Sequence, residues 1–155
     1  MPVRESQIFL KQPTKILKVR YMSRGYVAVP IVLALVANGL VYGHPAALWV
    51  RPKNPRLPPG WVIGAVWVVL FGMLGHVAYL VRTHRGLHAL VGIILAYCLA
   101  YPFATNVAPS LAGSLNAGAL LLAVVLVCAL AAQRRTRAVV WSVPLLAWCA
   151  YVNGE

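Results

Sequence analysis

The sequence predicts an all-α integral membrane protein, a bundle of five transmembrane helices. Of its 155 residues, 61% are hydrophobic and only 10% are charged. Several apolar runs are long enough to cross the ~30 Å hydrocarbon core of a bilayer. The acidic residues are Glu5 and Glu155, so no carboxylate lies within any of these runs. Because a helix satisfies its backbone hydrogen bonds internally, such runs form spanning helices in lipid.

The apolar runs define one transmembrane domain, residues 26–155, after a basic N-terminal tail, residues 1–25. The tail shows no clear apolar period, and it is expected to be partly disordered or to lie upstream of the true start, since Met1 and Met22 are both candidate start residues. The five spans are predicted at residues 26–43, 60–81, 87–104, 111–133 and 138–152.

The connection at residues 44–59 contains five prolines, which exclude a continuous helix. We expect it to lie at the membrane surface as an ordered or semi-rigid flap.

Positive charge predicts the orientation of the bundle. Eleven of the 14 Lys and Arg residues lie in the tail and in the connections near residues 82–86 and 134–137, which share one side of the membrane. The other three lie in the 44–59 connection. The positive-inside rule therefore places the N-terminus in the cytoplasm, with a bacterial cell membrane as the expected location. Because apolar spans interrupt the basic clusters, we expect contacts with lipid headgroups and no nucleic-acid partner.

The spans lack the residues of several common chemistries. Ion-coupled transporters usually carry an intramembrane carboxylate, and none is present. There is no Gly-rich phosphate loop and no Ser/His/Asp set. The three cysteines show no CxxC spacing, so no metal site and no disulfide framework is expected.

Histidines offer one further candidate chemistry. His76 is the one histidine well inside a span, and a haem held by two histidines would need a second one at depth. A neutral, hydrogen-bonded histidine is therefore the favoured interpretation. His84 and His88 are four residues apart, and solvated polarity beside the membrane is favoured there over metal binding.

Aromatic side chains recur on single helix faces in three spans. The pairs are Trp67 and Phe71, Tyr97 and Tyr101, and Trp141 and Trp148. Ile63 precedes the first pair on the same stripe. These faces predict a pocket for a flat, largely apolar ligand. The alternative is an interfacial aromatic belt, which is favoured for Trp61 and Trp141, whereas both interpretations stay open for Trp67 and Trp148.

Small residues line one face of the third span. Gly92, Ala96 and Ala100 follow a four-residue spacing that lets helix backbones approach closely. They indicate either packing within the bundle or a homodimer interface. Ser114 and Gly118 in the fourth span form a rival set.

Two stretches resemble a known family. Residues 58–81 follow Pro-Pro-Gly-x-x-Ile-Gly-x-x-Trp-x-x-Leu-Phe-Gly-x-x-Gly-x-x-x-Tyr-Leu-Val, and residues 144–148 read Pro-Leu-Leu-Ala-Trp. Both are similar to motifs of the TspO/MBR family, the tryptophan-rich sensory proteins related to the mitochondrial translocator protein. The resemblance covers about residues 26–155.

This resemblance implies a five-helix bundle, often a dimer, that binds porphyrin-type tetrapyrroles such as protoporphyrin IX, and sometimes sterols, in a pocket closed by the first connection. Trp67 and Trp148 match the two tryptophans that flank the ligand. Pro58, Ile63 and Phe71 match neighbouring wall positions. Gly92, Ala96 and Ala100 resemble the dimer motif of the third helix.

The third span departs from the family pattern, because residues 87–105 contain neither Asn nor Trp. Tyr97 and Tyr101 are expected to replace the aromatic wall, while one polar ligand contact is left without an equivalent.

The function predicted from the resemblance is a receptor, sensor or carrier that takes a porphyrin as ligand and requires no cofactor. The alternatives are an enzyme that degrades the bound porphyrin oxidatively in light through Trp67 and Trp148, and a structural membrane subunit with no ligand.

Overall fold

The computed structural model describes residues 12–42 and 58–154. The tail before Gln12 and the proline-rich connection up to Leu57 lie outside the described residues. Every regular element in the described part is helical, which confirms the all-α prediction. The elements are α1 (Gln12–Tyr42), α3 (Gly60–Leu80), α4 (Arg85–Val107), a short 3-10 helix η1 (Pro109–Leu111), α5 (Ala112–Ala132) and α6 (Thr136–Gly154).

Four helices in the described part are long and apolar enough to cross a membrane, namely α1 from Arg24 onward, α3, α4 and η1 together with α5. This finding confirms an integral membrane protein. Helix α6 has 19 residues, and it is less apolar because Arg137, Pro144 and Asn153 lie within it. Proline is also present inside α1 and α4. Membrane helices tolerate such prolines because neighbouring groups can satisfy the freed carbonyl oxygens.

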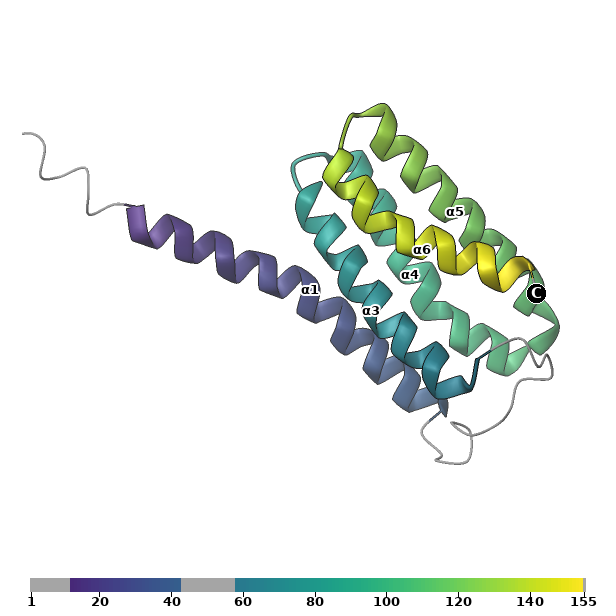
Figure 1. Ribbon diagram of the computed structural model, residues 1–155. Helices are drawn as coiled ribbons and strands as arrows, with labels where there is room; N and C mark the ends of the chain where they lie inside the picture. Colours follow the sequence, from purple (N-terminus) through teal and green to yellow (C-terminus); the bar gives the residue numbers. More distant parts are fainter. Residues whose placement is uncertain (1–11, 43–57, 155) are drawn as a thin grey trace, which may run out of the picture.

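The helix bounds lie within three residues of the predicted spans at every end except the start of α1. Helix α1 begins at Gln12, so residues 12–25, predicted as a tail, belong to a helix that continues into the first span. In Figure 1 this part of α1 extends away from the other helices. Helix α6 ends at Gly154, two residues beyond the predicted 138–152 span.

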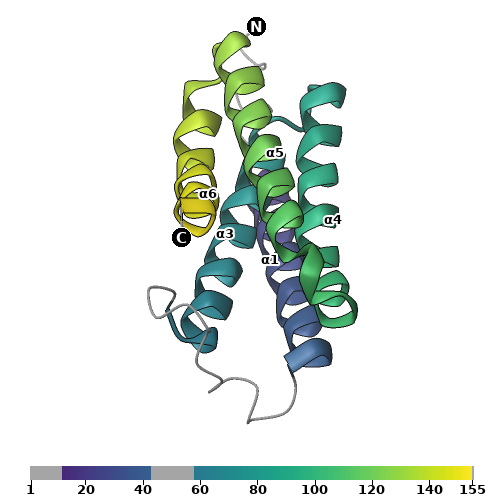
Figure 2. The ribbon, with the colours of Figure 1, turned by 90° about the vertical axis from the view of Figure 1, so that its right-hand side faces the viewer.

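The five long helices form a ring in the order α1, α3, α6, α5 and α4, with α4 returning to α1 (Figures 1 and 2). Helices α3 and α4 also touch each other directly. The most extensive contacts join α1 with α3 and α5 with α6. Among the long helices, α3 and α4 therefore have three neighbours each: α1, α4 and α6 for α3, and α1, α3 and α5 for α4.

The two ends of the bundle differ in their connections. At one end, here called the turn end, residues 81–84 join α3 to α4 and residues 133–135 join α5 to α6. At the other, the loop end, α1 ends, α3 begins and residues 108–111 join α4 to α5.

The hydrophobic core lies mainly toward the turn end. Its fully buried hydrophobic members come from three helices, α3, α4 and α5, and from the turn between α3 and α4: Leu74, Val77, Val81, Val91, Ile94, Leu126 and Leu130.

Close approach of α1 and α3 depends on glycine. A Cβ on Gly75 would overlap the carbonyl oxygen of Tyr26, and one on Gly72 would lie 3.1 Å from Ile31 Cδ1. The ring of Tyr26 packs against Tyr79 and His88, each with ring centroids 5.8 Å away. The ring contacts join α1, α3 and α4 near the turn end. The two glycines let α1 and α3 approach closely, which is the usual role of small residues in membrane helix packing.

Candidate functional site

A cavity of about 560 Å³ opens among α1, α3 and α4, toward the loop end. Its volume falls in the ~300–1,000 Å³ range of small-molecule sites. Its lining is almost entirely apolar and aromatic, and among the described residues it carries no charged side chain. The residues that argue for ligand binding are Ala34, Ala37 and Asn38 of α1, Trp61, Ile63, Trp67 and Phe71 of α3, and Cys98 and Tyr101 of α4.

Three of the predicted α3 residues meet in this cavity. Ile63, Trp67 and Phe71 all line it, as expected from their common helix face. The rings of Trp67 and Phe71 are tilted by 59° with centroids 6.0 Å apart, a favourable aromatic arrangement. Phe71 is buried and Trp67 is half-buried, so the indole is the ring that a ligand in the cavity can still reach.

The two tyrosines of α4 face different neighbours. Tyr101 lines the cavity. Tyr97 instead points to α5, where its hydroxyl donates a 2.9 Å hydrogen bond to the carbonyl oxygen of Leu115. Gly118 makes room for the ring, because a Cβ at that position would overlap the Tyr97 hydroxyl. The structure therefore does not bring Tyr97 to the cavity that Tyr101 lines.

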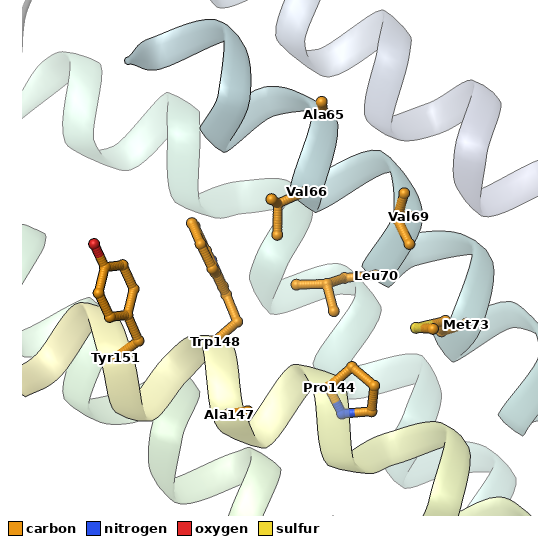
Figure 3. Close-up of a pocket in the computed structure, with 9 residues that line it drawn as sticks. All are labelled: Ala65, Val66, Val69, Leu70, Met73, Pro144, Ala147, Trp148 and Tyr151. Carbon is orange, nitrogen blue, oxygen red and sulfur yellow. The ribbon is translucent and has the colours of Figure 1, made fainter. Parts of the chain in front are cut away.

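Trp148 lies in a second hollow, a groove of about 660 Å³ between α3 and α6 (Figure 3). The indole projects from α6 toward α3, beside Tyr151, with the two ring centroids 5.7 Å apart. Val66 and Leu70 form the facing wall. Trp67 and Trp148 therefore line different hollows on α3, and the predicted stacking of one ligand between them stays a prediction.

Pro58 lies just before α3 and lines neither hollow. It is half-buried, and Pro59 after it precedes the first helical residue, Gly60. The carbonyl oxygen of Pro59 accepts hydrogen bonds from the amides of Val62 and Ile63. In the described residues, the role of this Pro-Pro-Gly turn is to begin α3 beside the cavity.

Trp61 and Asn38 are among the cavity residues that were not predicted as ligand contacts. Trp61 was interpreted as an interfacial anchor, yet it lines the cavity while remaining 53% exposed. Asn38 also lines the cavity, and it is the one amide in the first predicted span. An amide in an otherwise apolar membrane helix usually marks a buried or functional position. The amide in an apolar span is therefore the sequence signal that could have identified Asn38 as a site residue.

The predicted dimer residues lie on the outer face of α4. Gly92, Ala96 and Ala100 are all exposed, and a Cβ built on Gly92 would meet no atom within 4 Å. Nothing in the described chain covers this stripe. A homodimer interface there stays a prediction.

The histidines make local contacts. His76 packs edge-on against Trp141, with centroids 4.9 Å apart, at the junction of α3 and α6. Nδ1 of His88 lies 3.2 Å from the carbonyl oxygen of Ala78, so this nitrogen carries the proton. His84 accepts a hydrogen bond from Arg135, which ties the two turns together. Within residues 12–42 and 58–154 no group of three His, Cys, Asp or Glu side chains is arranged for a metal ion.

The arrangement is suited to binding. Apolar and aromatic walls remove a flat hydrophobic molecule from lipid or water, and a few polar atoms can orient it. The lining offers an amide, a phenol, a thiol and two indole N–H groups. Among the described residues, the lining holds no carboxylate, imidazole or ammonium group.

Comparison with known proteins gives one match. The sequence model of the TspO/MBR family matches residues 26–153, nearly the whole chain. No curated protein and no solved structure matches the chain significantly.

Proposed function

Because the chain belongs to the TspO/MBR family, we propose that it binds a flat tetrapyrrole of the porphyrin class in the cavity among α1, α3 and α4. Family membership directly supports a sensory or binding protein of the membrane. The observation that carries the choice of a porphyrin as ligand is the cavity itself, which has ring faces, an apolar lining and a suitable volume.

Porphyrin chemistry suits this lining. A porphyrin is a planar aromatic macrocycle, so a half-buried indole such as that of Trp67 can stack on it. Ile63 and Phe71 supply apolar contact on the same side, and Tyr101 supplies a ring from α4. Since the described part of the lining holds no cationic or acidic side chain, a fully hydrophilic ligand would lose its hydration there without compensation. The cavity therefore favours amphipathic, largely apolar ligands.

The proposal is tested by titrating the purified full chain in detergent with protoporphyrin IX and following the porphyrin absorbance. Saturable binding is expected. Replacing Trp67 with leucine keeps an apolar side chain and removes the stacking ring, so we expect affinity to fall by up to about tenfold. Trp141→Leu is the matched control, because Trp141 contacts His76 outside both hollows.

A parallel Trp148→Leu variant locates the ligand. If only Trp67→Leu weakens binding, the ligand occupies the α1/α3/α4 cavity. If both variants weaken it, the ligand contacts both tryptophans, as the family resemblance implies. An effect of Trp148→Leu alone would move the site to the α3/α6 groove and contradict the proposal. Absence of saturable binding in the unmodified chain would leave a structural membrane subunit as the better description.

A further inference from the structure

Asn38 of α1 places a polar amide in the otherwise largely apolar lining of the cavity. It lies on α1, four residues before the helix ends at Tyr42, so it is about 6 Å from that end along the axis. Its side chain lines the cavity together with Ala34 and Ala37, which are buried on the same face of α1.

The amide of Asn38 has no hydrogen-bond partner among the described residues. Other polar side chains near the membrane do find one: Thr105 donates to the Tyr101 carbonyl oxygen, and Asn153 donates to the carbonyl oxygens of Asn116 and Cys149. An amide in a membrane helix without such a partner is costly, because lipid offers no replacement. The amide therefore has unused hydrogen-bonding capacity in the cavity.

The cavity is also polarised along its length. Phe71 lies eleven residues into α3, about 17 Å from the loop end, beside the apolar Cys98 and Leu99 of α4. Asn38 lies much closer to the loop end. A ligand with one apolar edge and one polar edge would place the apolar edge toward Phe71 and the polar edge toward Asn38.

We propose that Asn38 is a specificity residue that donates a hydrogen bond from its amide to a carboxylate or carbonyl oxygen on the polar edge of the bound tetrapyrrole. This inference rests on the proposed function. It explains how the chain can retain a polar ligand contact although residues 87–105 contain no Asn, because an amide on α1 reaches the same cavity as α4. Asn38 thereby selects porphyrins with acid side chains over porphyrins that carry alkyl groups alone.

The test compares two porphyrins on the same protein. Protoporphyrin IX carries two propionates on one edge, whereas octaethylporphyrin carries only ethyl groups. Asn38→Leu removes the amide and keeps the side-chain size. We expect it to weaken protoporphyrin IX binding by about tenfold, and to leave octaethylporphyrin binding unchanged.

Asn106→Leu is the matched control, since Asn106 is an exposed residue of α4 near the loop end and lines neither hollow. It should change neither affinity. Asn38→Ala provides a second variant with the same expected selectivity, in case leucine disturbs the helix contacts.

The outcomes separate the two proposals. Equal loss for both porphyrins in the Asn38 variants would show a steric role and overturn this assignment alone. Unchanged binding of both porphyrins would also overturn it alone. If the unmodified chain bound neither porphyrin, the proposed function would fail, and this assignment with it.

Discussion

The two halves of α3 have the same hydrophobic character and opposite packing. From Leu70 to Ala78 most residues are buried, including Leu74 and Val77. From Gly60 to Val69 none is buried, although this half holds both tryptophans of the helix. The same division continues in α4, whose buried residues end at Cys98. Among the described residues, the turn end of the bundle is thus a packed core, and the half of α3 toward the loop end borders the cavity and the groove.

Glycine shows how the division arises. Gly75 and Gly72 lie where α1 contacts α3: a Cβ at Gly75 would overlap the α1 backbone, and one at Gly72 would press on the side chain of Ile31. Gly64, in the hollow half of the same helix, has nothing within 4 Å of the position of a Cβ. Identical residues therefore serve close packing in one half and border empty space in the other. Hydrophobicity alone does not distinguish the two halves, because lipid-facing, core and cavity positions are all apolar.

The largest effect on stability is expected from Gly75→Ala. The new methyl group overlaps the Tyr26 carbonyl oxygen, which is backbone and cannot rotate away, so α1 must shift. We expect a loss of about 1–3 kcal/mol, as in overpacked cores. Thermal unfolding of the detergent-solubilised protein measures it.

Gly64→Ala is the matched control on the same helix. The open space at Gly64 accepts the methyl group, and alanine has the higher helix propensity, so stability should stay constant or rise by up to about 1 kcal/mol. If the two variants were equally destabilised, the contrast between the halves of α3 would be wrong.

A smaller effect on stability, together with a clear effect on binding, is expected from Gly64→Leu. The leucine side chain enters the α1/α3/α4 cavity, where Gly64 is part of the lining. Melting temperature should change little, because the side chain fills a space that is already open. Protoporphyrin IX affinity should fall by at least about tenfold, since the ligand and the side chain compete for one volume. A variant that binds porphyrin normally would indicate that the ligand lies elsewhere.

The smallest effect on the monomer is expected from Gly92→Leu on the outer face of α4. This position is open in the monomer, so melting of the monomer should not change. If a second copy covers Gly92, Ala96 and Ala100, the leucine will separate the helices and weaken dimerisation by about tenfold. Sedimentation in detergent measures the dimer fraction, and Gly113→Leu on α5, also at an open position, is the control. An unchanged dimer fraction would exclude this face as the interface.

Much of the fold followed from the sequence, because apolar runs of membrane-spanning length have few alternatives to a helix. Four of the five predicted spans meet the length and composition of a membrane span. The helical start of α1 at Gln12 did not follow, since the basic residues before Tyr26 break the apolar period without breaking the helix.

The site followed only in part, for a geometric reason. Periodicity tells which residues share a helix face, and it does not tell which helix that face meets. Tyr97 and Tyr101 are about 40° apart around α4, and the boundary between α5 and the cavity falls between them. Trp67 and Trp148 were linked by the family resemblance, and in the structure α3 stands between the hollows that they line. Asn38 carried a signal, an amide in an apolar span, to which no role was assigned.

Ala65 lines both the α1/α3/α4 cavity and the α3/α6 groove, so the first half of α3 is a partition one helix thick between them. A lipid that occupied the groove and a ligand that occupied the cavity would press on the same helical turn from opposite sides. Linkage is reciprocal, so whatever either occupant does to the affinity of the other is returned by the same factor. If porphyrin affinity changed with the acyl-chain length of the lipid, the partition formed by α3 would be the structural route for that coupling.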